Sequence, residues 1–335
     1  MASITNLPSS SFSSSLPDLA IEGVSEDNAV VRVYYGSVTI FSQTLWPDIS
    51  GRISLLGFAD MVTRHMRQRG LLQITLTVSV TPMGGSSIAK SCTTYFSTVY
   101  IGNADTFNTS RFLTMCDGPK YTNIGRAERL YSRTSSCRLS ITYDDGSRQT
   151  PTVPYSQVSN GIYAYDLGRF LVLVNGHRPS HIVAVSGDRV QQYIIPSADD
   201  IDIDGLVFVN AFGLKETVYF SGVHTNKPSF KRGEIRTGRA IRQYVIEETV
   251  THEWNTGIIT LPTARLVQDL LRSYNIRRIS TGEKVVITEC KPDYDDADDT
   301  VVSLTVSWQL ASNIQESEGA SQGGIFDDTF DDSFN

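Results

Sequence analysis

Hydrophobic and polar residues alternate along most of this chain in short runs, which is the pattern of half-buried β-strands. Valine, isoleucine, threonine and aromatic residues dominate the runs, and turn-forming residues separate them. The segments with this pattern are 29–45, 71–80, 93–102, 137–147, 169–176, 206–222, 240–254, 284–290 and 300–310. Asp-Asp-Gly at 144–146 and Asn-Gly at 175–176 predict hairpin turns. The chain is therefore expected to be mainly β.

Only two stretches show the spacing of an amphipathic helix. Residues 54–70 place Leu55, Phe58 and further apolar residues at intervals of three and four and close on Gly70. Residues 263–276 repeat this spacing after a Pro-Thr start. Each helix is expected to pack its apolar face on a neighbouring sheet.

The two helices lie in similar sequence frames, which predicts an internal repeat. The first frame runs from Trp46 through Gly51 to a helix and a strand, and the second runs from Trp254 through Gly257 to the same elements. We expect residues 46–80 and 254–290 to fold alike, as strand, helix and strand.

The expected fold class is a set of tandem β-sandwich-like units, two of them with one packed α-helix each, followed by a disordered acidic C-terminal tail. The 335 residues are long enough for two or three domains. The predicted organisation is a Ser-rich leader at 1–20, a β unit with a helix at 21–105, a central β unit at 106–235, a second β unit with a helix at 236–312, and the tail at 313–335. Residues 150–156 and 224–238 are expected to be long loops.

The net charge of −7 conceals an uneven distribution of acidic residues. Fifteen of the 36 lie in three windows, 199–204, 293–299 and 316–332, which contain no lysine or arginine. The other 21 acids face 29 bases, so the rest of the chain is basic, with a formal charge of +8. An acidic tail on a basic body favours contact between copies.

The chain ends in an acidic segment studded with phenylalanines, GGIFDDTFDDSFN at 323–335. One interpretation is a solvated terminus that aids solubility. The other is a docking peptide whose rings enter the pockets of a partner. Its candidate docking residues are Phe326, Phe330, Phe334, Asp327, Asp328, Asp331 and Asp332. The candidate acceptor is the densest basic cluster of the chain, Arg236, Arg239 and Arg242.

No metal or cofactor is expected. His177 and His181 have HxxxH spacing, but Pro179 between them favours a loop over a metal-binding helix. The string DIDIDG at 200–205 resembles the start of a calcium loop, with Asp200, Asp202 and Asp204 in ligand positions. Ala211 stands where an EF-hand needs its bidentate glutamate. An exposed acidic strand edge is the preferred interpretation, and a calcium site of another geometry stays open.

Catalytic signatures are also missing. The sequence has no GxSxG elbow, no phosphate-binding glycine motif and no clustered histidines, so an enzyme is not expected. Four cysteines without CxxC spacing, Cys92, Cys116, Cys137 and Cys290, read as free thiols. The basic stretch 230–244 could contact nucleic acid, but sparse aromatics and overall acidity favour a solvated face or an acidic protein partner.

The sequence shows neither a secretory signal at its start nor a run of eighteen apolar residues. We therefore expect a protein made in the cytosol, with no membrane partner.

Four segments resemble the tail structural proteins of bacteriophages and prophages. They are VYYGSVTIFSQTLWPDISGRISL at 33–55, FVNAFGLKETVYFSG at 208–222, the stretch from LLRSYNIRRI at 270 to VSWQLAS at 312, and IFDDTFDDSF at 325–334. The resemblance implies a non-enzymatic virion subunit, built from tandem β-domains and assembled in the host cytoplasm. Its partners would be further copies of itself and other virion proteins. The alternative is a glycan- or receptor-binding β-sandwich adhesin, whose partner would be a host surface glycan.

Overall fold

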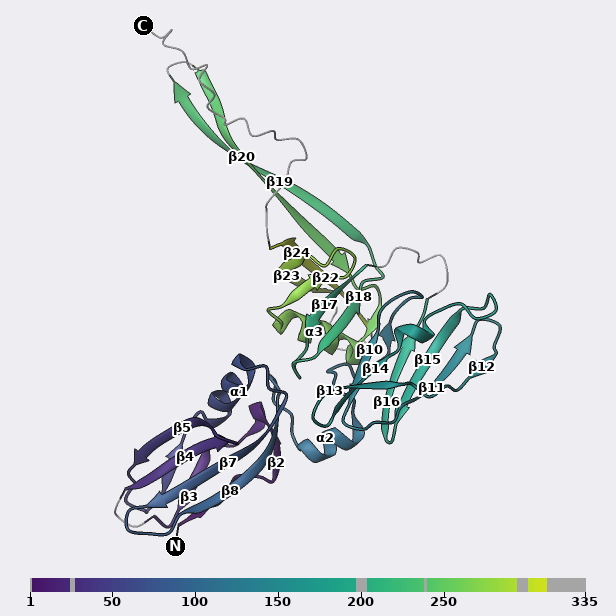
Figure 1. The fold of residues 1–335 in the computed structure, drawn as a ribbon. Helices are drawn as coiled ribbons and strands as arrows, with labels where there is room; N and C mark the ends of the chain where they lie inside the picture. Colours follow the sequence, from purple (N-terminus) through teal and green to yellow (C-terminus); the bar gives the residue numbers. More distant parts are fainter. Residues whose placement is uncertain (1, 25–27, 197–203, 238–239, 294–300, 312–335) are drawn as a thin grey trace.

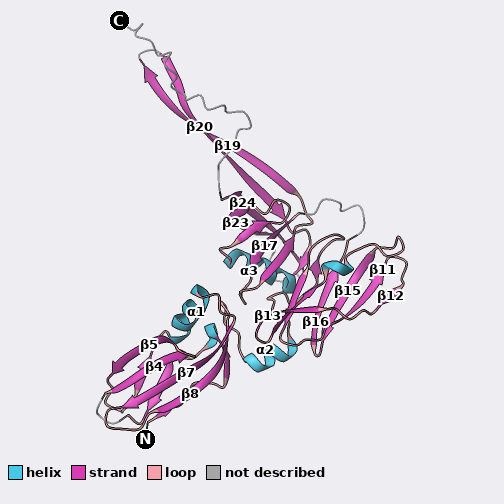
Figure 2. Cartoon of the chain, in the orientation of Figure 1, coloured by secondary structure: helices cyan, strands magenta, loops and turns pink. Residues whose placement is uncertain are grey.

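The computed structural model describes residues 2–24, 28–196, 204–237, 240–293 and 301–311. Within these ranges the chain is mainly β, as the alternating pattern predicted, and it forms three β-rich units and one long projecting hairpin (Figures 1 and 2). The described residues also contain a short helix that the sequence pattern did not reveal, α2 (Ala104–Ser110). The Asn103 side chain caps this helix by accepting a hydrogen bond from the Thr106 amide at 2.9 Å.

The first unit packs a five-stranded sheet against a three-stranded sheet and one helix. The larger sheet has the order β2-β8-β7-β4-β5, with β2 (Ser10–Phe12), β4 (Ala29–Tyr35), β5 (Val38–Leu45), β7 (Gln73–Pro82) and β8 (Ile88–Tyr95). The smaller sheet has the order β1-β3-β6, with β1 (Ser3–Ile4), β3 (Leu19–Glu22) and β6 (Ile53–Leu55). Helix α1 (Phe58–Gln68) connects β6 to β7.

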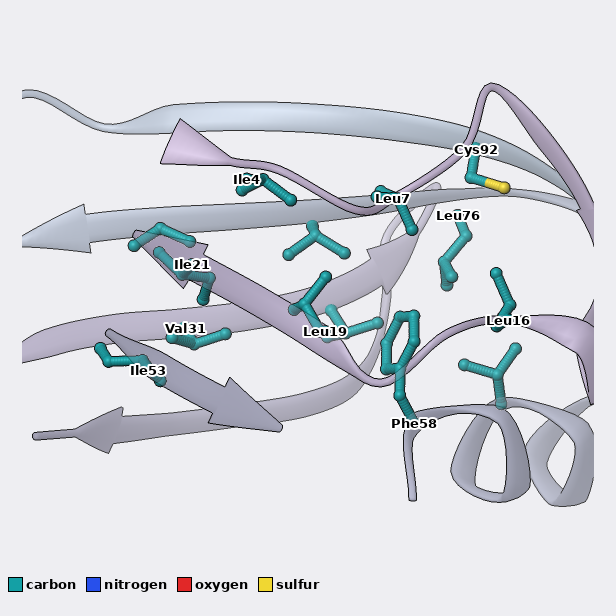
Figure 3. Packing of buried hydrophobic residues seen from close by; sticks show 14 of the residues in the cluster. Ile4, Leu7, Leu16, Leu19, Ile21, Val31, Ile53, Phe58, Leu76 and Cys92 are labelled. Carbon is teal, nitrogen blue, oxygen red and sulfur yellow. The ribbon is translucent and has the colours of Figure 1, made fainter. Parts of the chain in front are cut away.

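Alternate side chains of both sheets meet in the core of the first unit (Figure 3). Val31 of β4, Leu76 of β7 and Ile21 of β3 are fully buried there, and Phe58 brings in the apolar face of α1. The expected amphipathic helix is therefore present, and it packs on the sheet as predicted.

The serine-rich leader predicted at 1–20 belongs to the first unit. Leu7, Leu16 and Leu19 are buried in its core, and the Phe12 ring is fully buried. Ser13 donates to the Ser97 carbonyl at 3.1 Å, and its own oxygen accepts from the Ser97 amide. The prediction of a separate leader was wrong because the few apolar residues between the serines are the ones that pack.

The second unit is built from two sheets with a shared core. One sheet has the order β12-β11-β15-β16-β9, with β12 (Arg148–Gln149), β11 (Arg138–Tyr143), β15 (Pro179–Ser186), β16 (Arg189–Ile194) and β9 (Lys120–Tyr121). The other has the order β10-β14-β13, with β10 (Arg129–Ser132), β14 (Ile162–Asp166) and β13 (Tyr155–Ser159). Asn175 and Gly176 form the predicted turn with positive φ values of 53° and 85°.

The third unit is one sheet with the order β18-β17-β22-β23-β24-β20-β19, covered by a helix. Its members are β17 (Gly205–Val209), β18 (Lys215–Tyr219), β19 (His224–Thr237), β20 (Ala240–Asn255), β22 (Ile276–Arg278), β23 (Lys284–Asp293) and β24 (Val301–Leu310). The short strand β21 (Ile259–Thr260) pairs with β24 and leads into α3 (Leu261–Arg272).

Two sequence predictions fail in the third unit. The boundary predicted at 235/236 falls inside β19, because β17 and β18 pair into the same sheet as β22 to β24. Residues 224–238, predicted as a long loop, are almost entirely strand β19. Their polar sequence misled the prediction because a projecting strand has no buried face to fill.

The first and third units share a strand order. In the first unit β5-β4-β7-β8 are antiparallel neighbours, and α1 connects β5, through β6, to β7. In the third unit β18-β17-β22-β23 are antiparallel neighbours, and α3 precedes β22 in the same way. The tryptophans of the proposed frame do not correspond, since Trp46 is 69% exposed and Trp254 only 3%.

A separate aromatic cluster joins the units. The Phe12 ring of β2 meets Phe107 of α2 at 5.4 Å and Phe212 of the β17–β18 turn at 5.7 Å between centroids. Residues of all three units are buried in this cluster, including Ile101, Tyr131 and Leu214. This packing joins the three units to one another.

Candidate functional site

The projecting hairpin, which we call the arm, is formed by β19 and β20. The two strands pair antiparallel from His224 opposite Trp254 to Thr237 opposite Ala240, with one β-bulge after Gly233. The described ladder joins β20 to a third strand only at His252–Asn255, where it pairs with β24. Beyond this base the arm is a two-stranded ribbon that extends away from the other described parts of the chain (Figure 1).

The base of the arm is held by stacked rings. His224 stacks on Trp254 at 4.7 Å, and His252 stacks on Trp308 of β24 at 4.1 Å between centroids. The two indoles meet edge to face at 4.8 Å, and Trp308 is fully buried. The His252 Nδ1 lies 2.7 Å from the Asn226 Oδ1, which links the two strands by a side-chain hydrogen bond. These contacts make the arm a rigid extension of the third unit at its root.

Charge changes sign along the arm. Residues 231–247, which form the outer half, contain five basic residues and two acidic residues. The inner half contains Lys227 against Glu248 and Glu253. Lys227 pairs with Glu253 at 2.6 Å. The outer half therefore offers a net positive surface to an acidic partner.

The structure places the predicted acceptor arginines at the outer end of the arm. Arg236 is exposed on β19 and lies opposite Ile241 of β20, which is 54% exposed. The backbone of Arg242 pairs with Ile235, but its side chain lies outside the described residues, as does the whole of Arg239. The other predicted docking residues, Phe326, Phe330, Phe334, Asp327, Asp328, Asp331 and Asp332, also lie outside the described residues.

Asp204 of the proposed calcium string is engaged within the protein. Its Oδ2 accepts from Arg278 Nε at 2.7 Å and from Ser280 Oγ at 2.6 Å, and its Oδ1 accepts from the Gly205 amide. Partial burial opposes ionisation, but the bonds from Ser280 and Arg278 outweigh it and lower the pKa of Asp204. Asp200 and Asp202 lie outside the described residues.

His177 and His181 do not act together. His181 lies in β15, opposite Thr142 and Ile194. The His177 ring lies in the neighbouring turn, 3.1 Å from Asp144 and 3.5 Å from Asp145. These exposed contacts link the two hairpin turns of the second unit, and the ligand atoms of the three residues lie within 4.8 Å of one another.

A buried ionic cluster joins the second and third units, and the sequence pattern gave no sign of it. Glu216 of β18 accepts from Lys120 of β9, from Thr114 and, at 2.8 Å, from Asn210. Lys120 and Glu216 are only 2% and 4% exposed. Burial disfavours the ammonium ion, but the carboxylate of Glu216 outweighs this effect, and the pKa of Lys120 is raised.

Glu128 lies beside this pair and is 1% exposed. Burial raises the pKa of Glu128 to about 7, although the charge of Lys120 acts in the opposite direction. Its Oε1 accepts from Thr217 at 3.0 Å. The cavity beside Lys120 has a volume of about 20 Å³, which is room for about one water molecule. A substrate cannot reach the cluster, so we assign it to the junction of the two units.

The raised pKa of Glu128 predicts a pH-dependent stability. The pKa of this carboxyl is about 7 in the folded protein and about 4.5 in the unfolded chain, so folding favours the neutral form. The stability that the neutral carboxyl contributes is therefore complete below about pH 4.5 and is lost as the pH rises through about 7. In Glu128→Gln this part of the dependence should vanish, and the variant should be more stable than the wild type by about 1 to 3 kcal/mol above pH 7. Urea unfolding at several pH values measures the difference. Parallel curves for the two proteins would contradict the assignment.

No protein-family model and no curated protein matches the chain. Among the described helices, none is both long enough and apolar enough to cross a membrane.

Proposed function

We propose that the chain is a non-enzymatic structural subunit of a phage tail, which assembles with itself and with other tail proteins through the arm. The proposal depends on one observation: beyond residues 252–255, the ribbon of β19 and β20 pairs with no other described strand. The four segments that resemble phage tail proteins, and the mainly β units, support the same function. In this proposal the subunit is made in the host cytoplasm and ends in the virion.

An isolated two-stranded hairpin is only marginally stable in water. From Asn226 to Thr237 the ribbon reaches roughly 40 Å, at about 3.3 Å per residue. Phe230 is 55% exposed on the ribbon, and the described pairings leave its outer strand edges open. A neighbouring subunit that pairs with an edge, or covers Phe230, would supply burial that the described part of the chain does not give the ribbon.

Charge suggests which surface of the neighbour the arm would meet. The outer half of the arm is basic, and the chain carries acidic windows at 293–299 and 316–332. In the proposed assembly, the acidic tail of one copy docks on the outer arm of another, and its phenylalanines contribute apolar burial. Such contacts should weaken with salt, because screening shortens the range of surface charges to about 8 Å at physiological ionic strength.

A protein with a shortened arm tests the proposed function, and the pairing of β19 with β20 shows where the arm can be cut. Lys227 lies directly opposite Thr251, so residues 228–250 can be replaced by the turn Asn-Gly without disturbing the pairs below them. The shortened protein should fold, and its melting temperature should lie within a few degrees of that of the wild type. Sedimentation velocity over a range of concentrations measures its self-association. The shortened protein should need at least about tenfold higher concentration than the wild type to associate, which corresponds to a loss of about 1.4 kcal/mol in the free energy of each contact.

A charge variant separates the role of the arm from a general effect of mutation. Arg236→Glu reverses an exposed charge on the outer arm, and Arg148→Glu reverses an exposed charge on β12 of the second unit. Only the first should weaken association, and 0.5 M salt should remove most of the difference. Equal association of the shortened and full-length proteins would refute the proposed function.

A further inference from the structure

The loop between β5 and β6 presents two large apolar side chains to solvent. Trp46 is 69% exposed, and Ile49 is 110% exposed, so no side chain of the described residues covers it. Exposed apolar side chains that lie together form the kind of patch that often marks an interaction site. We call residues 46–51 the apolar tip.

The apolar tip is held in shape by the protein. Asp48 Oδ1 accepts from the Ser50 amide at 2.9 Å, from the Ser50 hydroxyl at 2.6 Å and from the Arg52 amide at 3.0 Å. Gly51 has a φ of 73°, and a Cβ at this position would lie 2.7 Å from the Val24 carbonyl oxygen. A loop that is fixed before binding loses little conformational entropy when it docks.

A concave apolar surface of matching size lies on the third unit. This groove, which we call the α3 groove, has a volume of about 640 Å³. Its lining residues are Asp117, Leu261, Pro262, Ala264, Arg265, Gln268, Leu271, Cys290 and Leu304. Leu261 and Leu271 remain 44% and 37% exposed although they line a hollow. The volume falls in the range of protein sites that enclose apolar ligands, and a tryptophan side chain fits such a site.

The charges of the two surfaces are complementary. At the rim of the α3 groove, Asp117 pairs with both Arg265 and Arg111, so the three side chains carry a net charge of +1. In the apolar tip, the bonds from Ser50 and Arg52 lower the pKa of Asp48, which is therefore ionised at neutral pH. Trp46 and Ile49 can enter the groove while Asp48 faces the arginines.

We propose that the apolar tip of one copy docks in the α3 groove of a second copy. The inference rests on the proposed self-assembly and adds a contact separate from the arm. Because the two surfaces lie on different units of the chain, the contact is head to tail. Such contacts generate rings if the rotation closes and stacks if it does not.

One substitution tests the contact, because Cys290 lies in the groove and is the only cysteine of the four that is not buried. In Ile49→Cys, diamide should oxidise the new thiol and Cys290 of a second copy to an intermolecular disulfide, with both thiol hydrogens passing to diamide. Peptide mass spectrometry should find the 49–290 link, and Ile49→Cys/Cys290→Ser should lose it. A control variant, Leu173→Cys, places a cysteine at another exposed apolar residue, 56% exposed in the second unit, and should give no link to Cys290. Cross-links of equal yield from both positions, or none from position 49, would overturn the proposal.

The fluorescence of Trp46 separates this contact from association through the arm. Trp254 and Trp308 are buried, so the fraction of emission that acrylamide quenches readily comes from Trp46. With rising protein concentration, this fraction should fall at least about twofold in the wild type, and Leu271→Glu should abolish the fall. If the protein associates and Trp46 stays quenchable, the tip contact is wrong and the proposed function stands. If the protein does not associate at any concentration, both fail. Protection of Trp46 only in the presence of residues 312–335 would show that the tail, and not the groove, covers Trp46, and it would overturn the tip contact.

Discussion

Replacing Glu216 with alanine should lower the free energy of unfolding by about 3 to 5 kcal/mol. The reason is that Lys120 would remain as a charge that is 2% exposed, without the carboxylate that compensates it. Asn210 and Thr114 would also lose their acceptor. Since these residues come from the junction of the second and third units, the loss should also loosen that junction. Urea unfolding followed by circular dichroism measures the loss.

The matched control removes both charges. Lys120→Met in the Glu216→Ala background replaces the orphaned ammonium with an apolar side chain of similar length, and it should recover much of the lost stability. A surface variant, Glu283→Ala, removes an exposed carboxylate and should stay within about 0.5 kcal/mol of the wild type. If the double variant were no more stable than Glu216→Ala, the loss would come from packing rather than from the uncompensated charge.

Trp308→Ala should destabilise the third unit by about 3 to 5 kcal/mol. Its ring is fully buried, touches Trp254 edge to face and supports His252 by stacking at 4.1 Å. Removing it leaves a cavity at the root of the arm, so the arm should lose its fixed direction as well. Hydrogen exchange of the amides of residues 224–227 and 250–255 should accelerate.

Trp46→Ala is the control with the same change of side chain. Trp46 is 69% exposed, so its loss should change the unfolding free energy by no more than about 0.5 kcal/mol. Fast exchange at the root in both variants, or in neither, would contradict the role assigned to Trp308. A stability loss in Trp46→Ala comparable to that in Trp308→Ala would show that the tip is part of the core.

Local pattern carried the prediction of the fold class. Strand alternation with β-branched residues depends on neighbours two positions apart, so runs such as 71–80 could be read directly, and β7 spans Gln73–Pro82. The helices were equally plain, because Phe58, Val62 and Met66 fall on one face and are buried. Helix α2 was missed because seven residues are too short to show a helical period.

Local pattern could not show where one unit ends and the next begins. The polar residues of β19 have no buried face, so their sequence looks like a loop, and only the long-range pairing with β20 makes them a strand. The serines of the N-terminus hid Leu7 and Leu16, whose burial depends on strands far away in the sequence. Pairing between distant segments is decided by the whole sheet, and no window of the sequence contains it.

The sequence by itself determined the mainly β class, the two amphipathic helices, the Asn175–Gly176 turn and the separation of charge between a basic body and acidic segments, because each depends on neighbouring residues or on composition. Only the tertiary structure decided which surfaces can act. It made an arm of 224–255, exposed Trp46 while burying Trp254, and brought Lys120 within hydrogen-bonding reach of Glu216. Exposure and burial are properties of the packed molecule: the same residue type becomes a docking surface or a core according to what the rest of the chain places against it.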